Sequence, residues 1–336
     1  MRRRWWWAPL LLVVAAGAWA WAVFAPYGTF PKPRLVELPA HSSSWRVARQ
    51  LRAAGVIRSA AAFELWVLAH PHRVLKAGWY QFAHSASMPE VAARLARGDV
   101  YYTTLVVPEG FNRFDIARAL ERNGIMPAAS FLAVTASPAL VRDLDPQAVS
   151  LEGYLFPDTY RIPPHAAPES VAEMMVRRFR QEWDRLRDGM KFDAATGPVS
   201  LHEWLTIASL VEKETAVPSE RAVIAGIFYN RLRQDLPLQC DPTVIYAALL
   251  LRRADPGTLH AADLRMESPY NTYRHAGLPP GPIANPGAAA LMAAAHPAAT
   301  PYLYFVSNGA GGHRFARTLR EQDHNILLYL RATRKR

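Results

Sequence analysis

The sequence predicts an α+β protein with an N-terminal transmembrane helix, a small βααβ module, and a mixed α/β domain that ends in a β-hairpin. Three observations support this: an uncharged run behind three arginines, an internal repeat, and two β-rich stretches joined by a glycine-rich turn near the C-terminus. The chain of 336 residues is long enough for two or three domains and a substantial core.

Composition narrows the possible partners. The formal net charge is +11, and it comes from arginines that are scattered rather than gathered into a tract. Membrane head groups or an anionic polymer are therefore possible partners. We expect no nucleic-acid partner, since the spacings of RRM, zinc-finger and helix-turn-helix modules are missing. The single Cys240 permits no internal disulfide or multi-cysteine metal site, and we expect a small core residue there and no cofactor.

Residues 1–34 are predicted to be a targeting segment. Arg2, Arg3 and Arg4 precede the uncharged run 5–24, which has the length of a bilayer-spanning helix. The positive-inside rule leaves residues 1–4 in the cytoplasm and the chain after Ala25 outside. A cleaved signal peptide is the alternative, because residues 18–20 (AWA) resemble a cleavage site. Run length and tryptophans near both ends favour a retained anchor, followed by a Pro-rich linker over 25–34.

Residues 35–126 contain an internal repeat. Without gaps, a shift of 69 residues aligns Pro39 with Pro108, and the same shift matches six further pairs. The pairs are Trp45 with Phe114, Ala48 with Ala117, Arg49 with Arg118, Leu51 with Leu120, Gly55 with Gly124 and Val56 with Ile125. Each copy passes from a β-rich start into an amphipathic helix that ends at glycine. In the first copy we expect a second helix over 60–69, a strand over 78–82 and a helix over 88–97, with a binding or structural role.

Residues 127–336 are predicted to form the remaining domain. The stretch 152–160 (EGYLFPDTY) is expected to be a turn packed against the domain, because it combines aromatic residues with proline and acids. Residues 168–186 predict a long amphipathic helix and 188–197 a loop. We expect Asp241 and Asn285, each followed by proline, to cap helices. Residues 268–283 predict an irregular ligand wall, 302–307 and 313–318 a hairpin, and 320–336 a basic helix.

The stretch 200–233 (SLHEWLTIASLVEKETAVPSERAVIAGIFYNRLR) combines a helix start with unusually placed acids. Ser200 and Glu203 predict a capping box, so the helix begins near Leu201. In projection, Glu212 and Glu214 fall on opposite margins of the apolar face. A carboxyl group there is partly desolvated, which raises its pKa and suits a general acid. Two solvated acids paired with neighbouring basic residues are the alternative.

Several chemistries are excluded. His202 and Glu203 lack the second histidine of a zinc protease, because Thr206 stands in its place. The chain also lacks a nucleophile elbow, a P-loop and a dinucleotide fingerprint. His313 beside two glycines could be a ligand, although a hairpin histidine is more often a surface residue. Glycoside chemistry remains, because it needs an acid of raised pKa and a groove of aromatic and amide groups.

Seven segments resemble the endolytic murein transglycosylase (YceG-like) family, in the order found there. They cover roughly residues 150–330, and the repeat region also resembles a LysM-like module. The segments are 152–160 (EGYLFPDTY), 208–215 (ASLVEKET), 230–232 (NRL), 239–246 (QCDPTVIY), 270–273 (YNTY), 277–281 (GLPPG) and 301–306 (PYLYFV).

The resemblance implies a bacterial inner-membrane protein with one membrane span and a periplasmic catalytic domain. Such a protein cuts MurNAc–GlcNAc bonds inside nascent glycan strands, leaves 1,6-anhydro-MurNAc ends and terminates strand elongation. Peptidoglycan synthases are possible partners. One glutamate can suffice, because the sugar's own 6-hydroxyl is the nucleophile and the same carboxylate can later take its proton. A non-catalytic scaffold for cell-wall synthases and a hydrolytic muramidase are the alternatives.

The resemblance also indicates site residues. Lytic transglycosylases of other families place Ser or Thr directly after the catalytic acid, so Glu214, which precedes Thr215, is favoured over Glu212. Five residues are expected to hold the glycan or orient the acid, each with a structural role as the alternative: Asn230, Gln239, Tyr246, Asn271 and Tyr273.

Overall fold

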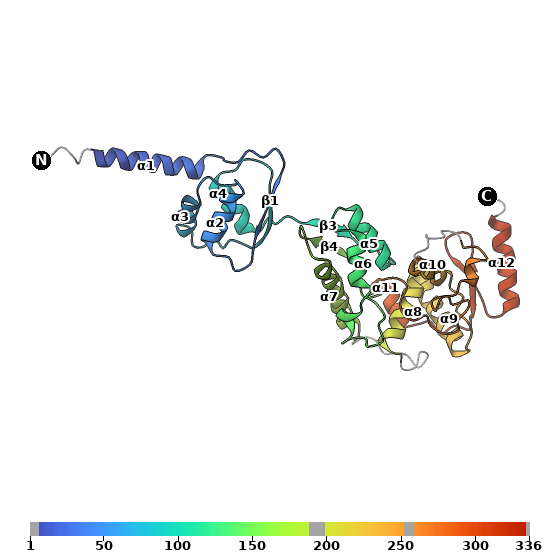
Figure 1. Cartoon of the computed structure of the whole chain (residues 1–336). Coiled ribbons are helices and arrows are strands. Elements are labelled where there is room, and N and C mark those ends of the chain that lie inside the picture. The colour runs from blue at the N-terminus through green and yellow to red at the C-terminus, as the bar shows by residue number, and fades with distance from the viewer. Residues whose placement is uncertain (1–6, 188–198, 252–258, 334–336) are drawn as a thin grey trace. The chain divides into compact units, whose positions relative to one another are not determined.

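The computed structural model describes residues 7–187, 199–251 and 259–333. Its contacts divide the chain into two compact units, one of residues 1–103 with 161–164 and the other of 104–160 with 165–336 (Figure 1). The predicted domain boundary after Met126 lies further along the chain than this division at Thr103. Among the described residues, no helix combines the length and apolar character that a membrane span requires.

The N-terminal unit contains the first helices and strands. Strands β1 and β2 pair in antiparallel register, with Val36 opposite Tyr80. Its elements are α1 (Trp7–Phe24), β1 (Arg34–Leu38), α2 (Ser44–Ala53), α3 (Ala60–Leu68), β2 (Gly78–Phe82) and α4 (Met88–Arg97). The helices over 60–69 and 88–97 and the strand over 78–82 were predicted within a residue of these bounds. The unit has its own core, in which Leu51, Phe63 and Leu95 are fully buried.

The C-terminal unit is mostly helical. Its elements are β3 (Thr103–Val106), α5 (Arg113–Arg122), α6 (Ala128–Thr135), η1 (Ala139–Val141), β4 (Thr159–Ile162), α7 (Pro168–Arg187), α8 (Leu201–Glu214), η2 (Pro218–Glu220), α9 (Arg221–Arg233), α10 (Asp241–Leu250), η3 (Asp263–Arg265), α11 (Ala288–Ala295), β5 (Tyr304–Ser307), β6 (His313–Ala316) and α12 (Leu319–Thr333). β3 pairs with β4 and β5 with β6, so the sheets described here are small and the fold is α+β.

The internal repeat found in the sequence is also present in the structure. α2 and α5 each begin at a side-chain cap, Ser43 in one and Asn112 in the other. Each ends at a glycine of positive φ, 69° at Gly55 and 64° at Gly124. The order β1-α2-α3-β2-α4 then recurs as β3-α5-α6-β4-α7 with η1 inserted. The two copies therefore share one βααβα plan, although the second belongs to the C-terminal unit.

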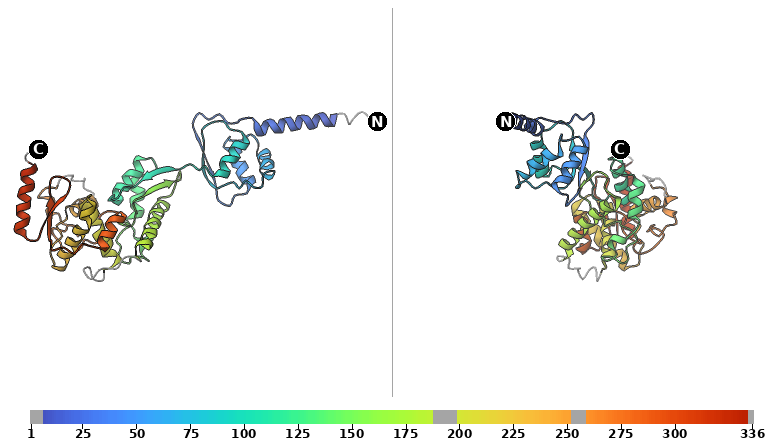
Figure 2. Two further views of the ribbon diagram at one scale, coloured as in Figure 1. Left: turned by 180° about the vertical axis from the view of Figure 1, so that it is seen from behind. Right: turned by 60° about the vertical axis from the view of Figure 1, so that its left-hand side comes forward.

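Helix α8 is the centre of the C-terminal unit. The predicted capping box is confirmed, since Ser200 and Glu203 exchange hydrogen bonds at its first turn. Residues 204–211 are all buried, because α8 packs against α9, α10 and α11. The Trp204 indole donates to the Leu291 carbonyl of α11 at 3.0 Å. Figure 2 shows α12, in red, beside the β5–β6 hairpin, against which it packs.

The predicted hairpin is confirmed, with Ser307 opposite His313. Two predicted caps are wrong. α10 starts at Asp241 itself, so its cap position is Cys240, and the Asp241 carboxylate accepts from the Tyr273 hydroxyl at 2.5 Å. Asn285 lies before the Gly287 cap of α11 and binds the backbone of Leu155 and Phe111 instead. The whole of the predicted loop 188–197 lies outside the described residues.

Candidate active site

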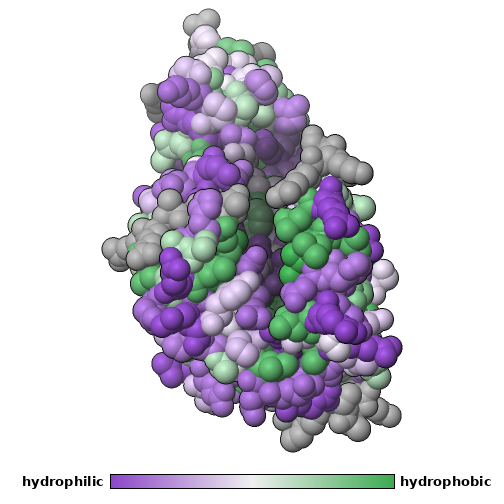
Figure 3. Space-filling view, turned by 90° about the vertical axis from the view of Figure 1, so that its right-hand side faces the viewer, coloured by the Kyte–Doolittle hydropathy of each residue, from purple (hydrophilic) through white to green (hydrophobic). Residues whose placement is uncertain are grey.

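A cavity of ≈ 490 Å³ opens in the C-terminal unit where α8 ends. Its walls come from α8, α9, the start of α10, the β5–β6 hairpin and α12, together with Tyr273. Figure 3 views the side on which α12 lies, where the surface is hollowed along its middle and both hydrophilic and hydrophobic residues edge the hollow. A groove of mixed character suits a glycan, because sugars present both hydroxyl groups and apolar ring faces.

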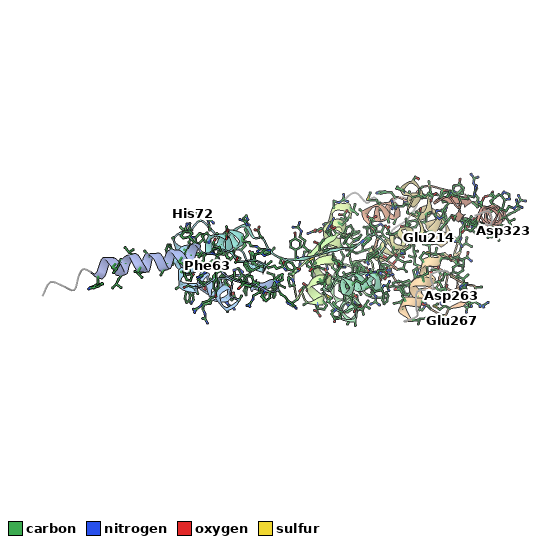
Figure 4. All side chains as sticks on the ribbon, turned by 90° about the horizontal axis from the view of Figure 1, so that it is seen from above. Phe63, His72, Glu214, Asp263, Glu267 and Asp323 are labelled. Atoms are coloured by element: carbon green, nitrogen blue, oxygen red, sulfur yellow. The ribbon has the colours of Figure 1, made fainter. Side chains whose placement is uncertain are left out.

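Glu214 is the last residue of α8 and lines this cavity. The chain leaves the helix there, since Thr215 is extended with φ −143° and ψ 132°. Figure 4 labels Glu214 among the side chains of the C-terminal unit. Burial raises the pKa of Glu214 to about 7, although a hydrogen bond with Cys240 lowers it and nearby Asp241 raises it again. The carboxyl group can therefore carry a proton near neutral pH, as a general acid must.

Cys240 is a structural partner of Glu214. The thiol is 2% exposed and hydrogen-bonds the Glu214 carboxyl. Burial and the adjacent Glu214 carboxylate raise the pKa of the thiol well above its ordinary value, so it stays neutral. A neutral, enclosed thiol is a weak nucleophile, which leaves Cys240 the role of positioning the acid.

A second titratable group lines the same cavity as Glu214. His313 begins β6 and lines the cavity. Its Nδ1 lies 2.7 Å from Oε2 of Glu220, and its backbone N–H donates to Oε1 of the same residue at 2.9 Å. The Thr215 hydroxyl donates to Glu220 at 3.2 Å. Burial raises the pKa of Glu220, but the hydrogen bonds from His313 outweigh this and lower it, so Glu220 is ionised.

Two of the five predicted binding residues lie at this cavity. The Gln239 side chain is exposed, and its Oε1 accepts from Nη2 of Arg231 at 2.8 Å. Arg231 also donates to the Pro237 and Leu303 carbonyls, which fixes its guanidinium in the wall. Tyr273 is held by Asp241. Amide, guanidinium and phenol groups thus meet around Glu214.

The other three predicted binding residues lie elsewhere and have structural contacts. Asn230 donates to the Thr300 and Tyr302 carbonyls at 2.8 and 2.9 Å. Asn271 is fully buried and donates to the Leu264 and Met266 carbonyls. Tyr246 is 2% exposed and hydrogen-bonds Glu152. For each of these three residues, a structural role was the stated alternative to glycan binding. The contacts found here are structural ones.

Glu212, the alternative acid, faces another element. Its Oε2 accepts from the Gly287 N–H at 3.1 Å, at the N-terminus of α11. Burial raises the pKa of Glu212, and the Gly287 hydrogen bond lowers it. Glu212 is not among the residues that line the ≈ 490 Å³ cavity. Glu212 therefore links α8 to the N-terminus of α11 through this hydrogen bond.

Glu152 shows that a raised pKa alone does not mark the acid. Burial raises the pKa of Glu152 to about 7, the same value as for Glu214. Its carboxylate is only 1% exposed and accepts from the Arg113 N–H and the Asn285 amide. Access to the cavity, which Glu152 lacks, separates Glu214 from it. Across the described ranges, no three His, Cys, Asp or Glu side chains gather as metal ligands.

Comparison with known proteins identifies the family of this chain. The model of the YceG-like family matches residues 36–327. The chain belongs to the YceG-like family. The endolytic murein transglycosylase of Bacillus subtilis (strain 168) is 33% identical over 303 residues, which span 86% of this chain and 82% of that protein. The protein of the same name from Streptococcus pneumoniae D39 is 30% identical over 319 residues, and the match spans 87% of this chain but 57% of the relative.

A solved structure of the family is also similar. The 2.6 Å crystal structure of a YceG-like protein from Listeria monocytogenes has a TM-score of 0.58 and 32% identity, covering 87% of this chain and 99% of that one. This YceG-like chain and its relatives therefore share both sequence and fold.

Sequence reasoning missed part of the site. Glu220 was assigned no role, and His313 was considered as a possible ligand but judged more typical of a surface residue. Arg231 was seen only as part of a motif. His313 reaches this site because the β5–β6 hairpin contacts Glu220, which is 93 residues away in the sequence. The glycine pair before His313 was the one local signal that could have pointed to it.

Proposed function

We propose that this protein is an endolytic murein transglycosylase, a lyase that cuts peptidoglycan glycan strands internally. The observation that carries the proposal is Glu214, a carboxyl group of pKa about 7 at the edge of a cavity with polar and aromatic walls. The family and the names of its relatives support the same activity. Cleavage within nascent strands would terminate their elongation.

We assign Glu214 as the acid that protonates the leaving oxygen of the MurNAc–GlcNAc bond. The C6 hydroxyl of the MurNAc unit attacks its own C1, which produces a 1,6-anhydro end without water. This route needs no second carboxylate nucleophile, in contrast to retaining hydrolases. Gln239 and Tyr273, which line the cavity, hold the glycan in this proposal. Asn230, Asn271 and Tyr246 have structural roles, through main-chain carbonyls for the first two and Glu152 for the third.

The first experiment compares Glu214→Gln with Glu212→Gln on purified uncross-linked glycan strands. We expect Glu214→Gln to lower the cleavage rate by at least about 100-fold, since general acid catalysis contributes that much. Glu212→Gln should keep most of the activity and lose up to about 1 kcal/mol of stability, because it removes one charged acceptor of the Gly287 N–H. Product ends are read by mass spectrometry after borohydride treatment, which reduces hydrolytic MurNAc ends but not anhydro ends.

The result separates the alternatives. Reducible ends would identify a hydrolytic muramidase, and glycan binding without products would identify a scaffold for synthases. Full activity in Glu214→Gln with loss in Glu212→Gln would move the acid to Glu212.

We also propose the placement of the protein in the cell. Residues 5–24 would anchor it in the bacterial inner membrane, with 1–4 in the cytoplasm and the catalytic region in the periplasm. The arginines before the uncharged run support this orientation. We propose that residues 35–126 act as a LysM-like region beside a catalytic region of 127–336. Sequencing the N-terminus of membrane-extracted protein tests the anchor, since a start near Trp21 would mean cleavage.

A further inference from the structure

A carboxylate contacts one ring nitrogen of His313, as it does for histidines that act as general bases in other active sites. A carboxylate accepts hydrogen bonds and cannot donate them, so the Nδ1 of His313, 2.7 Å from ionised Glu220, must carry the hydrogen. Nε2 is then the acceptor nitrogen of the neutral ring. Because the ring lines the cavity that contains Glu214 and Nδ1 is occupied, Nε2 is the atom left to meet a ligand there.

The hairpin is shaped around this pair. A Cβ on Gly312 would lie 2.7 Å from Oε1 of Glu220, closer than real Cβ contacts come. A side chain at this position would displace the end of Glu220, whose Oε1 accepts from the His313 backbone N–H. The third contact of Glu220 is the hydroxyl of Thr215, the residue after Glu214. One carboxylate thus ties the histidine to the end of the helix that carries the acid.

We propose that His313, oriented by Glu220, is the base of the cleavage reaction, which rests on the proposed transglycosylase function. Nε2 takes the proton of the MurNAc C6 hydroxyl as O6 bonds to C1. The C1–O4 bond breaks at the same time, and the leaving O4 takes its proton from Glu214. The products are an anhydro end and a free 4-hydroxyl. The imidazolium then returns its proton to the Glu214 carboxylate directly or through water, so both groups recover their starting states.

Other groups at the cavity are less suited to this step. Asp241 accepts from Tyr273, and the raised pKa of Tyr273, caused by burial and by Asp241, keeps that phenol neutral. Glu220 is engaged by His313 and Thr215. The remaining titratable groups of the cavity wall are Arg231, Tyr304 and Tyr329. Arg231 cannot act as a base, and a phenol accepts a proton readily only as phenolate.

The test uses the full-length protein and purified uncross-linked glycan strands, with kcat and KM measured from pH 5 to 9. We expect wild type to lose rate on the acid side, where a protonated imidazole accepts nothing. His313→Gln should lower kcat by about 100-fold with little change in KM and should remove the acid-side fall. Glu220→Gln should lower kcat less, about tenfold, because an uncharged amide orients the ring and its Nδ1 hydrogen less firmly than the carboxylate does.

His313→Ala in added imidazole provides a second readout that a misfolded protein cannot give, and we expect partial recovery of kcat. His275→Gln, at an exposed histidine outside the cavity, is the matched control and should behave as wild type. If His313→Gln keeps wild-type kcat and the acid-side fall, the inference is overturned and Glu214 carries both protons. If wild type itself yields no anhydro ends, the proposed function fails instead, and the two failures are told apart by this one product assay.

Discussion

At the residue scale, the environment of each glutamate decides its chemistry. Glu152, Glu212 and Glu214 are all carboxyl groups whose pKa is raised chiefly by burial. The first two accept hydrogen bonds from backbone N–H groups at helix N-termini, where a negative charge is stabilised. Glu214 instead lies at the C-terminal end of its helix and lines a cavity. The helix dipole there disfavours the ionised form, which suits an acid that must hold its proton.

The pKa of Glu214 leads to a pH prediction. Because the acid must be protonated and its pKa is about 7, the cleavage rate should fall as pH rises through about 7. The same pKa, raised from 4.5, means that the folded state holds a proton which the unfolded state releases. Stability should therefore decline as pH rises from about 4.5 to 7, and Glu214→Gln should lack this part of the decline. Initial rates and thermal melts from pH 5 to 9 measure both effects.

Substitution of Cys240 tests the same pH dependence of the cleavage rate. Its thiol lowers the pKa of Glu214 by hydrogen bonding, so Cys240→Ala should move the alkaline fall in rate to higher pH. We expect Cys240→Ala to be a few-fold more active than wild type, relative to each one's maximum, at pH 8. Cys240→Ser keeps a donor and is the matched control. An unchanged alkaline limb in Cys240→Ala would mean that the rate does not report Glu214.

At the residue scale, part of the candidate site could be predicted from the sequence. It singled out Glu214 because Thr215 follows it, and Gln239 and Tyr273 because of their motifs, and the structure places all three along one cavity. Asn230, Tyr246 and Asn271 belong to the same motifs but bind main-chain carbonyls or a buried acid. A motif does not show whether a polar side chain binds a ligand or the protein's own main chain, because either role limits which residue type can occupy that position. Only the fold separates them.

At the element scale, local signals placed most helices well. The capping box fixed the start of α8, and the glycine pair marked the hairpin turn. Asp241 was misplaced by one position, because an acid suits both the cap and the first turn of a helix. The contact between α8 and α11 could not be predicted, since it depends on atoms far apart in sequence. Examples are the Trp204 indole with the Leu291 carbonyl and Glu212 with the Gly287 N–H.

Helix α9 gives a prediction about packing between elements. A Cβ on Gly226 would lie 2.4 Å from the carbonyl oxygen of Ala298, a main-chain atom that cannot rotate away. Ala298 is also bound to α9 through its N–H to the Ala222 carbonyl at 2.8 Å. Gly226→Ala should therefore destabilise the protein by about 1–3 kcal/mol, although alanine favours a helix.

Gly281→Ala is the matched control for this substitution. Its Cβ would come no closer than 3.3 Å, to a methyl group of Val149, and its φ lies outside the left-handed region. We expect a change within about 0.5 kcal/mol. Urea unfolding of both variants measures the difference, and equal midpoints would show that α9 can move away from the 298–300 segment at no cost.

At the scale of the whole molecule, the chain contains two compact units and two copies of one βααβα plan. The sequence revealed the repeat through matched glycines and apolar positions, because these fix the helix ends and the core in each copy. It placed the domain boundary after the second amphipathic helix, since a repeat read from sequence groups its two copies together. The contacts place α5 with the C-terminal unit, where its first N–H groups meet Glu152 and its own cap Asn112. Long-range contacts of this kind leave no periodic signal in the sequence.

The division predicts that the two units respond separately to core damage. Phe63 and Phe179 are 0% and 1% exposed, one in the core of the N-terminal unit and the other packed edge-on against Tyr154 in the C-terminal unit. Phenylalanine to alanine in a core costs about 3–5 kcal/mol. In calorimetry we expect two transitions, with Phe63→Ala lowering only one and Phe179→Ala only the other.

The residues that line the Glu214 cavity all belong to the C-terminal unit. The Phe63→Ala variant should therefore still cleave short soluble strands at a near wild-type rate. The Phe179→Ala variant should lose activity at a lower temperature than wild type. A single transition lowered equally by both substitutions would contradict this independence and would mean that the repeat copies fold as one cooperative body.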